Sequence, residues 1–91
     1  MEWHVVVVKV ESVRGKCARG HHPGQEWRIA QKTPEGICIG AFGSLIPAIR
    51  TLQFGGTFPW QTDPNVAKVG CPDPVNSVTY LIERLEETCQ P

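Results

Sequence analysis

The 91-residue sequence contains no long apolar run and no excess of charge of either sign. Its longest uninterrupted apolar stretch is the four valines at 5–8, whereas a membrane-spanning helix needs about 20 such residues. Nine basic residues balance nine acidic ones, and aromatic residues are not interleaved with the basic ones in the way that favours nucleic-acid binding. We therefore expect neither a membrane nor a nucleic acid as a partner.

The N-terminal stretch MEWHVVVVKV also lacks the basic region that opens a signal peptide, which predicts a cytoplasmic protein. In a reducing cytosol, cysteines serve metal binding, catalysis or packing more often than disulfides. Close C-x-x-C pairs are missing as well, because the four cysteines lie 21, 33 and 18 residues apart. Any site that they share must therefore be assembled by the fold.

The length of the chain predicts one small domain over residues 1–91. A domain of this size buries only about 60–65% of the surface that its unfolded chain exposes. The core is therefore expected to be thin, so that long loops need an anchor of their own.

Alternating apolar and polar residues predict two strands near the N-terminus. Residues 3–13 continue the valine run with this alternation, and residues 26–30 place Trp27 and Ile29 on one face. The intervening loop over 15–24 contains Pro23-Gly24, a strong turn pair, so we expect the two strands to be antiparallel neighbours.

The middle of the chain predicts a short helix. Ser44 is a favourable N-cap, which would place Pro47 in the first turn, and Gly55-Gly56 would end the helix. Apolar residues recur here at helical spacing: Phe42, Leu45, Ile46, Ile49 and Leu52.

The remainder of the chain is expected to be a long connection followed by a strand. Residues 57–75 contain four prolines and no clear periodicity, so we expect a long proline-rich loop, attached to the core by Trp60. The apolar residues of 76–85 fit either a strand or a helix, but the β-branched and aromatic content favours a strand through Glu83, after which the end of the chain is expected to turn helical or fray. The predicted class is α+β: a small, mostly antiparallel sheet with one short helix packed on it.

Three of the four cysteines share a local feature. Cys17, Cys38 and Cys71 each have a glycine within two positions, which lets backbone N–H groups approach the sulfur, whereas Cys89 has none. Such hydrogen bonds and tight bends surround iron–sulfur clusters. The three cysteines are therefore candidate ligands of one metal or cluster site.

Two cofactors fit a three-cysteine site. A [4Fe–4S] cluster would keep one iron open for Asp73, His21, His22, a water or a substrate. A zinc ion would instead form a closed site with His21 or His22 as the fourth ligand. Ligand types alone do not choose between the two metals.

Other interpretations of the same residues require no metal. Buried cysteines often act only as small apolar side chains. Lys16, Arg19 and His21 would favour the thiolate of Cys17, and His21 or His22 could be the base of a thiol enzyme, although no acid nearby orients either ring. A third alternative is a metal-free binding module whose basic hairpin docks an anionic ligand. The partner would be a small molecule or a protein, and free sheet edges would allow a homodimer.

The segments GKC…GHHPGQEW, PEGICIGAFGSLIPAIRTLQFGGTFPW and CPDPVNSVTYLIER cover most of the chain. In these segments the sequence resembles a family of short uncharacterised prokaryotic proteins. The resemblance implies that Cys17, Cys38 and Cys71 belong to one motif, and that Cys89 does not. It implies no particular activity. The chain departs from the pattern at Ile39-Gly40, where the family carries a larger, more polar or aromatic pair.

Overall fold

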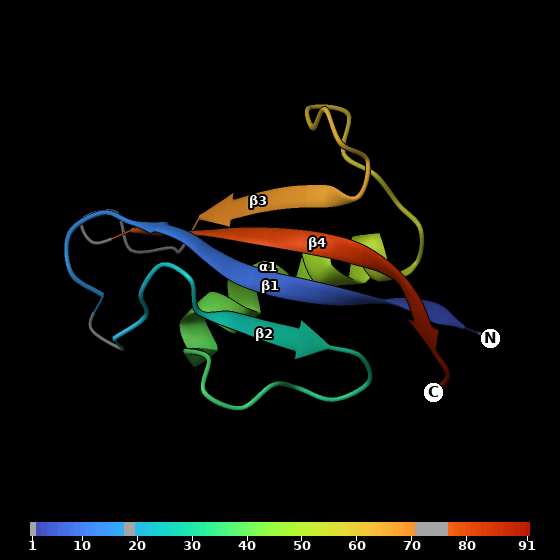
Figure 1. The fold of residues 1–91 in the computed structure, drawn as a ribbon, viewed down its shortest axis with the longest axis horizontal. Coiled ribbons are helices and arrows are strands. Elements are labelled where there is room, and N and C mark those ends of the chain that lie inside the picture. Colours follow the sequence, from blue (N-terminus) through green and yellow to red (C-terminus); the bar gives the residue numbers. More distant parts are fainter. Residues whose placement is uncertain (1, 18–19, 71–76) are drawn as a thin grey trace.

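A computed structural model describes residues 2–17, 20–70 and 77–91 of the chain. These residues form one antiparallel sheet with strand order β2-β1-β4-β3, and one helix that packs on it (Figure 1). The elements of this described part are β1 (Trp3–Val13), β2 (Glu26–Ile29), α1 (Ile39–Gln53), β3 (Val66–Gly70) and β4 (Val78–Cys89). The predicted α+β class is therefore confirmed.

The two longest strands, β1 and β4, form the centre of the sheet. Their pairing runs from Trp3 opposite Cys89 to Val13 opposite Val78, with irregularities after His4 and after Val10. β1 has the predicted bounds, and β2 ends one residue before the predicted Ala30. The short strands β2 and β3 form the two edges of the sheet.

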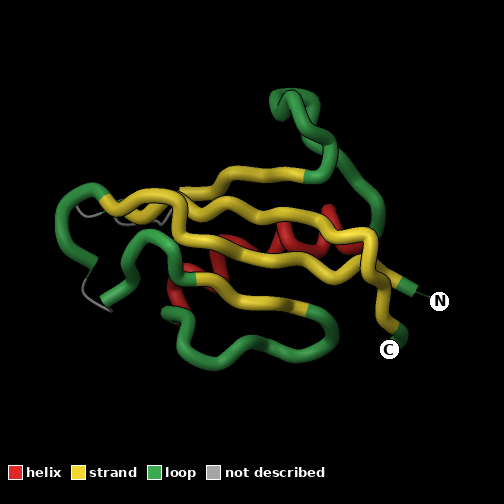
Figure 2. The backbone as a smooth tube through the Cα atoms, viewed as in Figure 1, coloured by secondary structure: helices red, strands yellow, loops and turns green. Residues whose placement is uncertain are grey.

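The helix covers one face of the sheet, and the core lies between the two layers (Figure 2). The strands contribute alternate residues to this core, as expected for a sheet with one covered face. Leu45 and Leu52 of α1 are fully buried against them. The strand residues that face the helix include Val6, Val8, Val10, Ala67, Val78, Tyr80 and Ile82.

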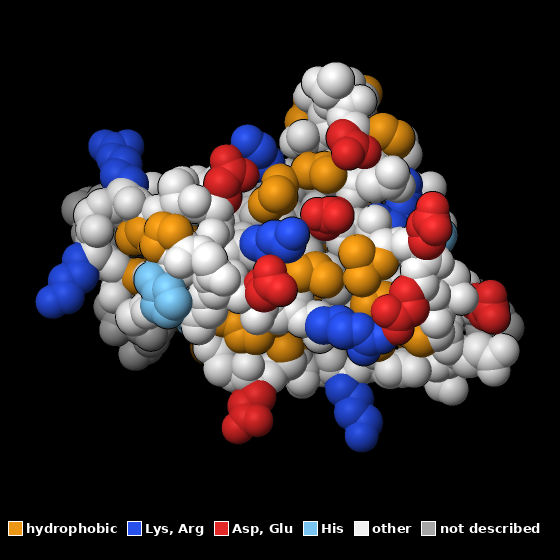
Figure 3. All heavy atoms as spheres, in the orientation of Figure 1, with side chains coloured by type: hydrophobic (Ala, Val, Ile, Leu, Met, Phe, Trp, Pro, Cys, Tyr) orange, Lys and Arg blue, Asp and Glu red, His pale blue; other side chains and the backbone are white. Residues whose placement is uncertain are grey.

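The other face of the sheet carries a mixture of charged and apolar side chains (Figure 3). Lys9 pairs with Glu83 across β1 and β4 at 3.5 Å, and Lys68 pairs with Glu11 at 3.0 Å. Because these pairs are exposed to water, each contributes less than about 1 kcal/mol to stability. No helix in the described ranges is long and apolar enough to cross a membrane.

The helix begins earlier than the sequence predicted. Cys38 occupies the N-cap, so Ser44 lies inside the helix, where its hydroxyl donates a hydrogen bond to the Gly40 carbonyl at 3.2 Å. The proposed Ser44 cap was therefore wrong, and Pro47 lies in the interior, where it cannot donate a hydrogen bond to Gly43. The predicted end is confirmed, because Gly55 follows the C-cap residue with a φ of 86°.

The expected loop over 57–75 contains a strand, which the sequence analysis missed. Residues 66–70 form β3, and they pair with β4 from Val66 opposite Glu83 to Gly70 opposite Thr79. The second half of β4 was also missed, because residues 84–89 continue the strand instead of becoming helical or frayed.

The anchor of the connection between α1 and β3 also differs from the prediction. Trp60 is 72% exposed, so it does not attach this segment to the core. Phe58 packs against the core instead, with the Trp60 ring 5.1 Å away on its outer side. The backbone of the segment is held by Arg84, whose guanidinium donates hydrogen bonds to the carbonyls of Gly56 at 2.7 Å and Pro64 at 3.0 Å.

Candidate functional site

One end of the sheet brings together parts of the chain that are far apart in sequence. β1 and β3 end there, β2 and β4 begin there, and α1 starts beside them (Figure 1). A hydrogen bond of 2.7 Å from the Arg14 N–H to the Ser77 carbonyl joins the two central strands at this end. We call this region the cysteine end, because it contains Cys17 and Cys38, both half-buried against the core.

His21 fixes the start of the helix within the cysteine end. Its Nε2 accepts a hydrogen bond of 3.1 Å from the backbone N–H of Cys38. The imidazole is only 6% exposed and contacts the Trp27 ring edge-to-face, with the ring centres 5.1 Å apart. An Nε2 that accepts this bond carries no proton and is already engaged. His21 therefore acts on Cys38 through the backbone, and its Nε2 is not the atom that would bind a metal.

Cys38 lies where a helix start favours an anion. It is the N-cap residue of α1, with φ −58° and ψ 132°, and its side chain does not cap the helix. The first turn of a helix presents backbone N–H groups and a partial positive charge, which stabilise a thiolate. A Cβ at Gly40 would be 3.9 Å from the Cys38 Sγ, so this glycine keeps the space beside the sulfur open.

Cys17 lies four residues beyond the end of β1. Its carbonyl accepts a hydrogen bond of 3.0 Å from the N–H of Gly20. Cys89 lies at the opposite end of the sheet, where it pairs with Trp3. None of the three described cysteines forms a disulfide. Cys17 and Cys38 thus lie at one end of the sheet and Cys89 at the other, and the shared site of Cys17, Cys38 and Cys71 stays a prediction.

The remaining candidate ligands differ in how far the structure describes them. His22 is exposed, with its Nδ1 3.2 Å from the Pro23 carbonyl. Cys71 and Asp73 lie outside the described residues, but Gly70, which precedes Cys71, ends β3 at the cysteine end. Within residues 2–17, 20–70 and 77–91, no three His, Cys, Asp or Glu side chains lie close enough to hold a metal ion.

The contact between His21 and Cys38 could not be predicted from the sequence. Histidine next to cysteine and basic residues favours the role of a ligand or a base, which is what the sequence predicts for His21. The contact depends on where the helix begins, and the Ser44 prediction placed that start too late.

Comparisons with known proteins add no further constraint on function. No family model, no curated protein and no solved structure matches this chain.

Proposed function

We propose that the chain binds a metal ion or an iron–sulfur cluster through Cys17, Cys38 and Cys71. The observation that carries the proposal is the convergence at the cysteine end. Cys17 and Cys38 are 21 residues apart in sequence and lie at the same end of the sheet, and β3 leads the chain from that end directly into Cys71.

The surroundings of Cys38 support this ligand set. The helix start favours a thiolate, and thiolates are the ligands of zinc and of iron–sulfur clusters. Three thiolates would leave one coordination position for His22, Asp73, a water or a substrate. His21 becomes a positioning residue in this proposal, because it holds the backbone of Cys38 and not the metal.

The proposal includes a cytoplasmic location. It rests on the N-terminal stretch MEWHVVVVKV, which lacks the basic region of a signal peptide. A chain with equal numbers of acidic and basic residues favours a small-molecule or protein partner over a nucleic acid.

The experiment is anaerobic purification, followed by an absorption spectrum and a metal analysis of the same sample. A broad absorption near about 400 nm with about three to four irons per chain would identify the cluster. One zinc per chain would identify a zinc site instead. A metal-free protein that is stably folded would overturn the proposal.

Serine variants test the individual ligands. We expect Cys17→Ser, Cys38→Ser and Cys71→Ser each to lose most of the bound metal and to unfold at a lower temperature. Cys89→Ser is the matched control, because this residue lies at the other end of the sheet, and it should keep its full metal content. Equal loss in all four variants would contradict the assignment. Selective alkylation of Cys17 in a metal-free, folded protein would favour thiol chemistry instead.

A further inference from the structure

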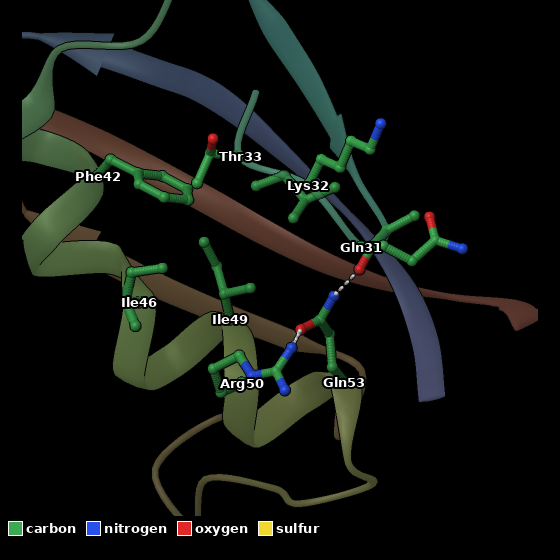
Figure 4. Close-up of a pocket in the computed structure, with 10 residues that line it drawn as sticks. Gln31, Lys32, Thr33, Phe42, Ile46, Ile49, Arg50 and Gln53 are labelled. Atoms are coloured by element: carbon green, nitrogen blue, oxygen red, sulfur yellow. Dashed lines mark hydrogen bonds between the residues drawn. The ribbon is translucent and has the colours of Figure 1, made fainter. Parts of the chain in front are cut away.

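A pocket of about 90 Å³ lies between α1 and the chain that leaves β2. Apolar side chains form most of its wall: Ile29 on the sheet side, and Phe42, Ile46 and Ile49 on the helix side (Figure 4). Ile46, on the helix side of the pocket, is 36% exposed.

A buried amide closes one side of the pocket. Gln53 is only 1% exposed, and its Nε2 donates a hydrogen bond of 3.0 Å to the Ala30 carbonyl. Its Oε1 accepts a hydrogen bond of 2.8 Å from Nη1 of Arg50 (Figure 4). Gln53 therefore joins the helix to the chain that follows β2 and also fixes the position of the Arg50 guanidinium.

Besides its hydrogen bond to Gln53, Arg50 contacts two aromatic rings. Its guanidinium carbon lies 4.4 Å from the centre of the Phe54 ring and 5.3 Å from the centre of the Trp3 ring. Stacking on aromatic rings orients a guanidinium while leaving N–H donors at its edge for an anion. The pocket thus has a cation whose position is set before any ligand binds.

The charges around the pocket all have the same sign. Lys32 and Arg50 are the charged residues that line it, and no carboxylate does. Figure 4 shows Lys32 on the wall opposite α1, with its ammonium pointing away from the helix. In the part of the chain that the structure describes, neither cation forms an ion pair. An apolar wall with two uncompensated cations fits an anion that carries a hydrocarbon tail.

We propose that this pocket, the Gln53 pocket, binds a short branched-chain monocarboxylate. The hydrocarbon tail would contact Phe42, Ile46 and Ile49, and the carboxylate would accept hydrogen bonds from Arg50, with Lys32 at the mouth. The pocket is smaller than a closed cavity of roughly 150 Å³ that takes up benzene, so its size limits the tail. A branched tail of about four carbons is therefore the size that we expect this pocket to accept.

The test is a titration of the isotope-labelled protein with 3-methylbutanoate, followed by amide chemical shifts. We expect saturable shifts at the residues that line the pocket. Neutral 3-methylbutanamide, which has nearly the same shape, should bind at least about tenfold more weakly, because it cannot make the charge-assisted hydrogen bond. Acetate should also bind at least about tenfold more weakly, because it lacks the tail.

Variants separate the pocket from the general surface. We expect Arg50→Met to weaken binding of the acid about tenfold or more, and Lys32→Met to weaken it severalfold. Lys68→Met is the matched control, because Lys68 pairs with Glu11 on the other face of the sheet, and it should bind like the unaltered protein. Ile46→Phe should fill the pocket and abolish binding while the exposed position preserves the fold.

Three results would overturn the inference. The first is the absence of saturable shifts with the acid, and the second is equal binding of the acid and the amide. The third is a set of shifts outside the pocket that Ile46→Phe does not change. None of these results depends on the metal content of the sample, so this test can fail while the proposed metal site stands.

Discussion

His21 connects three parts of the molecule through one side chain. Its ring packs against Trp27 and Tyr80, whose ring centres lie 5.1 and 6.4 Å from its own, and its Nε2 accepts the Cys38 N–H. The first N–H groups of a helix have no partner within the helix, so this bond satisfies a donor that is otherwise orphaned. His21 thereby determines where α1 starts and how Cys38 is held.

Replacing His21 with alanine tests this role. We expect the free energy of unfolding to fall by about 2–4 kcal/mol, because the change removes a buried ring and leaves the Cys38 N–H unsatisfied. His22→Ala is the matched control, because this neighbouring side chain is exposed, and its effect should stay within about 0.5 kcal/mol. Urea unfolding followed by tryptophan fluorescence measures both variants. Equal effects in the two would show that the contact does not stabilise the helix start.

At the scale of elements, α1 contains residues that are unusual in a helix. Pro47 in its interior removes one backbone hydrogen bond, and Gly43 is a weak helix former one turn earlier. The helix persists because its buried face packs on the sheet through Leu45, Ile49 and Leu52. Tertiary packing therefore contributes more to its stability than local propensity does.

Two glycines of this region should respond oppositely to a methyl group. A Cβ at Gly43 meets open space, whereas a Cβ at Gly56 would lie 2.6 Å from the Thr51 Cγ2 and 2.9 Å from the Thr51 carbonyl oxygen. We expect Gly43→Ala to raise the free energy of unfolding by about 0.5–1 kcal/mol through higher helix propensity. Gly56→Ala should lower it by about 1–3 kcal/mol, because the backbone must shift.

Thermal unfolding followed by circular dichroism compares the two glycine variants. The Gly56 N–H donates to the Thr51 carbonyl at 2.8 Å, so this close approach is part of how the helix ends. If Gly43→Ala and Gly56→Ala both raise the free energy of unfolding, the chain after α1 relaxes more easily than this geometry implies.

At the scale of the whole molecule, Arg84 holds the sheet, the helix and the connection between α1 and β3 together. From β4 its guanidinium reaches the Leu52 carbonyl in α1 at 3.1 Å and the carbonyls of Gly56 and Pro64 in the connection. Its Nε donates to the Asn65 side chain at 3.1 Å. A small core gives such a segment little apolar area for attachment, so hydrogen bonds from a single arginine supply it.

Arg84→Met should therefore destabilise the molecule more than the loss of an exposed ion pair does. We expect a decrease of about 2–4 kcal/mol in the free energy of unfolding, because several carbonyls lose a charged donor. Arg84→Lys should not restore stability, because an ammonium cannot reproduce the planar arrangement of donors.

Arg28→Met is the matched control for Arg84. Arg28 pairs with Glu87 on the exposed face of the sheet, so its loss should cost less than about 1 kcal/mol. Chemical unfolding of the three variants measures the difference. Full stability in Arg84→Lys would mean that positive charge, and not the geometry of the guanidinium, holds the segment.

Local patterns in the sequence determined the class of the fold, β1 and the buried face of α1. The alternation over residues 3–13 and the helical spacing of Leu45, Ile49 and Leu52 are carried by neighbouring residues, so both can be recognised without the rest of the chain. The set of Cys17, Cys38 and Cys71 was also chosen from a local pattern, the glycines close by in sequence, and it stays a prediction.

Features whose stabilising partners are distant in sequence become visible only in the folded chain. β3 is a strand because β4 pairs with it, and β4 extends to Cys89 because Trp3 lies opposite. The role of His21 and the Gln53 pocket likewise depend on contacts across 17 and 23 residues, made by Cys38 and by Ala30 respectively. The physical reason is that hydrogen bonds and burial from distant segments outweigh weak local propensity.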